Sequence, residues 1–166
     1  MHVERRTGMG LPKVVSSCLA LIVALLLAAC SGTLFHKFAP VENGQWLKND
    51  TLAFQYQNNG NGIECCINAD VRLFASYPYK DLLLHLQVAT VSNEIPLLSD
   101  TLVFSVYDDD GRRLGTTAGL LYQVSSNSLR CVSPIGEPVV IKLSHIMECD
   151  TLCGVSDAGI RIVAGN

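Results

Sequence analysis

Beyond residue 50 the chain is dominated by alternation of apolar and polar residues. The longest run covers residues 64–73, where apolar side chains occupy every second position: Cys65, Ile67, Ala69, Val71 and Leu73. The residues between them are Glu64, Cys66, Asn68, Asp70 and Arg72. Because successive side chains of a strand point to opposite faces, this pattern predicts a strand with one buried and one outward-facing side. Residues 51–57 alternate in the same way.

Shorter patterns of the same kind predict further strands. They cover residues 81–91, 100–107, 120–124, 139–145 and 159–163. Turn-forming residues separate them, including the run 58–62 and the pairs Asp110-Gly111 and Ser133-Pro134. No twelve-residue window after residue 30 keeps a helical period. The pattern predicts an all-β fold, an antiparallel β-sandwich of jelly-roll-like type.

One domain accounts for the chain beyond residue 49. Residues 30–49 contain Gly32, Pro40 and the pair Asn43-Gly44, which break any period, so a tether is predicted there. Residues 50–166 then form a single β-sandwich domain, long enough to build a stable core alone. An open barrel is the alternative. It would place ligand contacts inside, and no polar set points the same way as the core residues.

The first 29 residues are typical of a bacterial secretion signal. The stretch 14–29 has fourteen apolar residues out of sixteen and no charge, and it follows the basic residues Arg5, Arg6 and Lys13. That stretch is too short for a permanent membrane span. It ends in Leu27-Ala28-Ala29-Cys30, and a cysteine directly after small residues is the lipid acceptor of bacterial lipoproteins.

We therefore predict that Cys30 is a lipid anchor whose thiol takes a diacylglyceryl group before the signal is cleaved. Several acyl chains on one residue make the attachment to a membrane effectively permanent. An ordinary signal followed by chance by a cysteine, or a plain transmembrane anchor, are the alternatives. Residues 31–36 include no acidic side chain. Inner-membrane retention tends to need an aspartate there and surface export an acidic run, so we expect the periplasmic face of the outer membrane.

The net charge of the chain after residue 29 limits the classes of partner that it can bind. After residue 29 the chain carries nine basic and fourteen acidic residues, a net charge of −5. Nucleic-acid binding requires a basic surface that replaces phosphate counterions. We therefore expect no nucleic-acid partner.

Cysteines are the most reactive side chains of the predicted domain. Five follow Cys30, and they are Cys65, Cys66, Cys131, Cys149 and Cys153. An oxidising compartment permits disulfides, although an odd number leaves at least one thiol unpaired. Cys65 and Cys66 point to opposite faces of one strand, and Cys149 could bridge to Cys153 across a tight turn. The sequence leaves the pairing open.

The segment 144–153 is the densest group of potential metal ligands. If residues 139–145 form a strand, His145 lies on the same face as Val139, Ile141 and Leu143, which is the core face. We predict a buried structural histidine and no metal site. A zinc site to which Cys149 and Cys153 supply thiolates is the alternative.

Other candidate sites have simpler explanations. The run Asp108-Asp109-Asp110-Gly111 lacks the distal glutamate of a calcium loop, so a hairpin turn with Gly111 at positive φ is predicted. Neither a Gly-x-Ser-x-Gly elbow nor a phosphate-binding glycine loop is present. Trp46 is expected to plug the edge of the sandwich, with a sugar platform as the alternative. We predict no catalytic residue and no cofactor site.

The chain resembles the gliding-motility lipoprotein family GldH of the Bacteroidetes. The segments that carry the resemblance are Leu27 to Cys30, Gly44-Gln45-Trp46, the stretch 50–54, Val71-Arg72-Leu73, Tyr77-Pro78-Tyr79-Lys80-Asp81-Leu82 and the stretch 145–160. The cysteines and the segment 92–98 depart from the family pattern. The resemblance implies an outer-membrane lipoprotein without known catalytic residues that works with gliding and type IX secretion components. Because some members come from bacteria that do not glide, motility itself does not follow.

The sequence thus predicts a lipid-anchored accessory or assembly factor that binds another envelope protein. Trp46, Tyr77, Tyr79 and the turn 108–111 are the expected exposed contacts. A glycan-binding module of a nutrient-uptake complex is the alternative, and an exposed coplanar aromatic pair would favour it.

Overall fold

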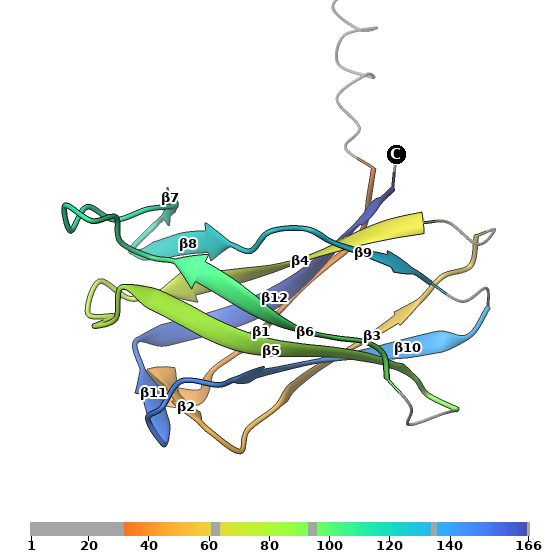
Figure 1. Cartoon of the computed structure of the whole chain (residues 1–166), viewed down its shortest axis with the longest axis horizontal. Helices are drawn as coiled ribbons and strands as arrows, with labels where there is room; N and C mark the ends of the chain where they lie inside the picture. The colour runs from red at the N-terminus through yellow and green to blue at the C-terminus, as the bar shows by residue number, and fades with distance from the viewer. Residues whose placement is uncertain (1–31, 61–63, 93–95, 134–135, 166) are drawn as a thin grey trace, which may run out of the picture. The chain divides into compact units, whose positions relative to one another are not determined.

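The structure is a computed structural model, and it describes residues 32–60, 64–92, 96–133 and 136–165. The predicted signal and the lipid anchor Cys30 lie outside the described residues. Two antiparallel sheets share one hydrophobic core (Figure 1). The all-β fold and the antiparallel sandwich predicted from the alternation are confirmed.

The first sheet has the strand order β1-β12-β4-β8-β7, and β9 also pairs with β4. Its strands are β1 (Thr33–Pro40), β4 (Glu64–Leu73), β7 (Thr116–Ala118), β8 (Leu121–Ser125), β9 (Leu129–Val132) and β12 (Val155–Ala164). The second sheet has the order β3-β10-β5-β6. Its strands are β3 (Leu52–Gln57), β5 (Asp81–Thr90), β6 (Pro96–Ser105) and β10 (Pro138–His145).

A small ribbon closes one end of the sandwich. It pairs β2 (Gln45–Leu47) with β11 (Thr151–Cys153), and a single 3-10 turn (Glu42–Gly44) leads into it. None of the described segments forms a helix with the length and hydropathy that a membrane crossing requires.

The core is built from the alternating positions. All five apolar residues of β4 are buried, and they face the buried residues of β5 and β10: Leu82, Leu84, Leu86, Val88, Val139, Ile141 and Leu143. Burial of such aliphatic side chains contributes about 1.5–3 kcal/mol each relative to exposure. The period of two therefore determines which face of each sheet meets the other.

The predicted tether differs from the structure. Residues 33–40, expected to be part of it, form the edge strand β1, which pairs with β12 from Thr33↔Val163 to Pro40↔Asp157. Phe35 packs its ring against Tyr56 at a centroid distance of 5.6 Å. The burial of Phe35 and Ala39 against the core holds the segment in the sheet, and β2 extends the folded region further.

The two ends of the sandwich differ in what they hold. At the entry end, where β1 begins at Thr33, the end of β12 and the start of β4 lie side by side in the register Ala164↔Cys65. The opposite end, called the motif end from this point, consists of residues 44–47, 74–80 and 146–154. Figure 1 shows β2 and β11 there, at the other end of β12 from the C terminus.

Candidate partner-binding site

Three segments that are distant in the sequence meet at the motif end through backbone contacts. The Gly154 N–H donates to the Gly44 carbonyl at 2.9 Å, and the Phe74 N–H donates to the Gly154 carbonyl at 2.9 Å. Gly154 has φ +92°, and a Cβ added there would lie 2.9 Å from the Tyr77 Cα. Only glycine suits this backbone conformation and this close approach. Gly154 therefore joins the segments around Trp46, Tyr77 and Cys153.

Trp46 and Tyr77 form the inside of the motif end. Trp46 is 1% exposed, and its indole N–H donates to the Asp50 carbonyl at 3.0 Å. Tyr77 is 2% exposed, and its hydroxyl donates to the Asp81 carbonyl at 3.1 Å. Burial is the main cause that raises the pKa of Tyr77. The prediction that both rings are exposed contacts is wrong, whereas the plug role predicted for Trp46 is confirmed.

Other apolar side chains at the motif end do reach the surface. They are Leu47, Phe74, Tyr79 and Ile146, each between 38% and 49% exposed. Interaction with Cys149 is the main cause that raises the pKa of Tyr79. Tyr79 is the one aromatic contact predicted from the sequence that the structure leaves exposed. This rim of apolar groups around a rigid base suits contact with another protein.

The aspartate turn borders the same region. The Gly111 N–H donates to the Asp108 carbonyl at 3.1 Å, and Gly111 has φ +76°. Tyr107 pairs with Arg113 across the turn. The hairpin turn predicted for residues 108–111 is confirmed. Lys80 forms an ion pair with Asp109, which links the turn to the segment that follows Tyr79.

His145 occupies the core face, as predicted. It is 1% exposed, and its ring contacts that of Trp46 at a centroid distance of 6.0 Å. Burial lowers the pKa of His145, and the Trp46 backbone partly opposes this shift. Among the described residues, no three histidine, cysteine or acidic side chains group as ligands for a metal ion. The zinc alternative at residues 145–153 therefore has no support in the structure.

The buried histidine predicts a pH dependence of stability. Its folded-state pKa is lower than the value of about 6.5 in an unfolded chain. The unfolded state therefore binds the proton first, and the free energy of unfolding falls as pH drops below about 6.5. We expect His145→Leu to remove this part of the pH dependence in denaturant unfolding between pH 7.5 and 5. Parallel profiles for the two proteins would contradict the assignment.

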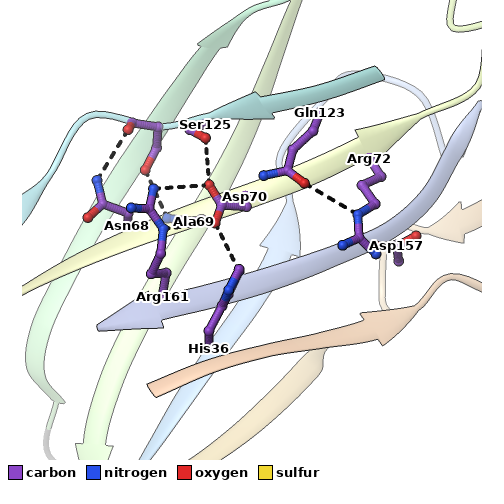
Figure 2. A network of polar contacts seen from close by, with 10 residues as sticks. His36, Asn68, Ala69, Asp70, Arg72, Gln123, Ser125, Asp157 and Arg161 are labelled. Carbon is purple, nitrogen blue, oxygen red and sulfur yellow. Dashed lines mark hydrogen bonds and ion pairs between the residues drawn. The ribbon is translucent and has the colours of Figure 1, made fainter. Parts of the chain in front are cut away.

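A second constellation lies on the outer face of the first sheet (Figure 2). The Asp70 side chain is only 1% exposed, although it points away from the core. Its carboxylate accepts hydrogen bonds from Arg161 Nε at 3.1 Å and Ser125 Oγ at 2.5 Å. It also pairs with His36 Nε2 at 3.2 Å. One carboxylate thus joins β1, β12, β4 and β8.

The neighbouring residues form a more exposed ion pair. Arg72 Nη1 lies 3.3 Å from Asp157 Oδ1 (Figure 2). The guanidinium of Arg72 also stacks 3.8 Å from the centre of the Phe38 ring. Gly159 leaves room for Phe38, because an added Cβ would lie 2.7 Å from the ring. The sequence pattern placed Asp70 and Arg72 on this face but did not indicate the pairs, whose partners come from other strands.

The comparisons with known proteins favour one family. The model of the GldH lipoprotein family matches residues 33–162. No curated protein sequence matches the chain.

Three solved structures have low similarity to the chain. Eiger TNF from S. frugiperda shares 8% identity at a TM-score of 0.35, covering 63% of this chain and 60% of its own. The CBM35 domain of Cellvibrio japonicus Abf62 shares 8% identity at a TM-score of 0.39, and the match covers 83% of this chain and 94% of the CBM35 chain. Dimeric latent PorU of Porphyromonas gingivalis shares 11% identity at a TM-score of 0.35, and the match covers 82% of this chain and 14% of the PorU chain.

The family match extends over nearly the whole folded region, from the first residue of β1 to Ile162 in β12. It includes every segment that builds the motif end and the outer face of the first sheet. The chain belongs to the GldH lipoprotein family, a family of membrane-anchored envelope proteins related to gliding motility.

Proposed function

We propose that the protein is a non-catalytic accessory or assembly factor of a gliding or type IX secretion-related envelope complex. Its lipid on Cys30 holds it on the periplasmic face of the outer membrane, and the motif end binds another protein of the complex. The observation that carries this proposal is the convergence of distant segments, all within the family match, on one end of the sandwich.

The motif end combines a fixed base with exposed apolar groups. Buried Trp46 and Tyr77, together with the backbone bonds of Gly154, hold the loops in one conformation. Leu47 and Phe74 then present apolar surface without the entropy cost of ordering a loop upon binding. A surface of this kind binds a protein partner better than a small polar ligand.

The direction of β1 supports an orientation in which the motif end points away from the lipid anchor. β1 begins three residues after Cys30 and runs towards the motif end over eight residues. A strand of that length spans about 27 Å. A lipid attached at Cys30 therefore leaves the motif end free to meet a partner. Confinement to a membrane surface raises the effective concentration of the domain near partners on that surface, which can replace high intrinsic affinity.

An exposed coplanar aromatic pair would favour the glycan-binding alternative, and the described residues provide none. Trp46 is buried and offers no open face to a sugar ring. Tyr77 and Tyr79 meet at an interplanar angle of 67°, with Tyr77 also buried. Among the described residues, no aromatic pair is both exposed and coplanar.

The proposal predicts that crosslinking depends on the position of the probe. A photo-crosslinking amino acid at Leu47 is expected to give discrete adducts with an envelope protein in native cells, identified by affinity purification and mass spectrometry. The matched control is Val103, which is 54% exposed on the outer face of the second sheet, against 49% for Leu47. We expect the Val103 probe to give none of these adducts.

A second control tests the contribution of the lipid. Cys30→Ala should move the protein out of the membrane fraction and abolish the Leu47 adducts through loss of confinement. Equal adducts from Leu47 and Val103, or recovery of glycan-uptake proteins alone, would count against the proposed role. A Cys30→Ala protein that remained acylated and membrane-bound would overturn the anchor assignment.

A further inference from the structure

Two cysteines face each other across the first sheet at the entry end. Cys65 on β4 and Cys131 on β9 are direct register partners in an antiparallel pair. The Cα atoms of such partners lie about 4.5–5.5 Å apart, and their side chains point to the same face of the sheet. Disulfides span Cα separations of about 4.4–6.8 Å. The backbone already has the spacing that a bridge requires.

The two side chains also influence each other. Interaction with Cys131 is the main cause that lowers the pKa of Cys65, and interaction with Cys65 is the main cause that raises the pKa of Cys131. Cys65 is 3% exposed, whereas Cys131 is half-buried. Both line a cavity of about 780 Å³ at the entry end, so a reagent can approach the pair from there.

The other cysteines do not share this arrangement. Cys66 follows Cys65 on the strand, points to the opposite face and has Arg130 as its register partner. Cys149 lies at the motif end, where it is partly buried against the core. Cys153 is exposed in β11. Cys65 and Cys131 are therefore the pair that the fold places in register.

We propose that Cys65 and Cys131, both thiols in this structure, form a disulfide in the cell by exchange with a protein or small-molecule disulfide. The inference rests on the proposed envelope location, because only an oxidising compartment maintains such an oxidant. The bridge links β9 covalently to β4 at the entry end, where β12 separates β4 from the start of β1, and it fixes this end of the sheet.

The exchange is balanced in two steps. One thiol of the pair loses its proton and attacks one sulfur of the oxidant, breaking the oxidant's S–S bond and releasing one thiol. The sulfur of the other cysteine, once deprotonated, then attacks the protein sulfur of the mixed disulfide and releases the second thiol. The two cysteines lose two electrons in total, the oxidant gains them, and the two protons end on its thiols.

Differential thiol labelling of the full-length protein tests the pair. Cells are lysed in denaturant with one maleimide, the protein is reduced, and newly exposed thiols take a second maleimide before mass spectrometry. We expect the second label on Cys65 and Cys131, and the first label on Cys66. Cys131→Ser should transfer Cys65 to the first label, and Cys65→Ser should do the same for Cys131. Cys66→Ser is the matched control and should leave the bridge intact.

Two results would overturn the inference. One is the first label on both residues in cells, and the other is a non-reduced peptide that joins Cys131 to a different cysteine. If the purified protein forms the bridge with oxidised glutathione but cells contain only thiols, the bridge is absent in the living protein and the oxidising location is also wrong. The partner-binding role is tested separately by the Leu47 adducts, which do not depend on the bridge.

Discussion

Trp46→Ala is expected to lower the free energy of unfolding by about 3–5 kcal/mol, the usual range for truncating a large buried aromatic residue. Trp46 is 1% exposed and covers His145 at the end of the core. Its strand β2 has only three residues and pairs only with β11 in the described part of the chain. Trp46 is the buried residue of β2, so alanine removes the apolar contact of this strand with the core.

Thermal or denaturant unfolding of the membrane-extracted protein measures the effect. The expected loss corresponds to a fall in Tm of about 10–20 °C for a domain of this size. Leu47→Ala is the matched control, because Leu47 is the next residue, is apolar and is 49% exposed. An exposed substitution of this kind should change stability by no more than about 0.5 kcal/mol. Similar losses in both variants would contradict the packing described for Trp46.

The contrast between these neighbours separates two roles within one motif. Trp46 supports the motif end from inside, so its loss would reduce partner binding through unfolding of the ribbon. Leu47 faces outwards, so a substitution there can reduce binding while the fold persists. A partner-binding defect of Leu47→Ala with unchanged stability would identify a contact residue.

Local periodicity was sufficient to predict the central strands. The alternation in residues 64–73 and 81–91 matches the burial pattern of β4 and β5. These strands lie inside their sheets, where one face of each is fully covered. The edge strand β1 was missed. β1 has a neighbouring strand on one side only. Its exposed residues Leu34 and Lys37 interrupt the alternation of buried and exposed positions that Phe35 and Ala39 would otherwise produce. Edge strands carry weaker periodicity because less of their surface is buried.

The parts of the site that were missed depend on contacts between distant residues. Tyr77 precedes a proline in a polar segment, which is typical of an exposed turn, yet Tyr107 donates to its carbonyl and Gly154 packs on its backbone. The alternation correctly assigns Asp70 to the outer face. The side chains that bury it, however, belong to residues that are between 34 and 91 positions distant in the sequence. No pattern within a single strand records these contacts.

Asp70→Ala is expected to lower the free energy of unfolding by about 2–3 kcal/mol. Removal of one partner from a fully buried ion pair costs about 3–5 kcal/mol. Arg161 and His36 are 34% and 39% exposed, so both can turn towards water once the carboxylate is gone, and the loss falls below that range. Because His36 lies on β1, native-state hydrogen exchange of residues 33–40 should accelerate more than exchange in β5.

Asp157→Ala provides the comparison that isolates burial. Asp157 also pairs with an arginine on the same face, at 3.3 Å from Arg72, but its side chain is 15% exposed and that of Arg72 is 35% exposed. Exposed pairs contribute about 0–1 kcal/mol. If burial determines the contribution, Asp70→Ala must be the more destabilising change, and only this change should loosen β1. Equal losses would mean that the two pairs contribute alike, and that Asp70 does not hold β1 in the sheet.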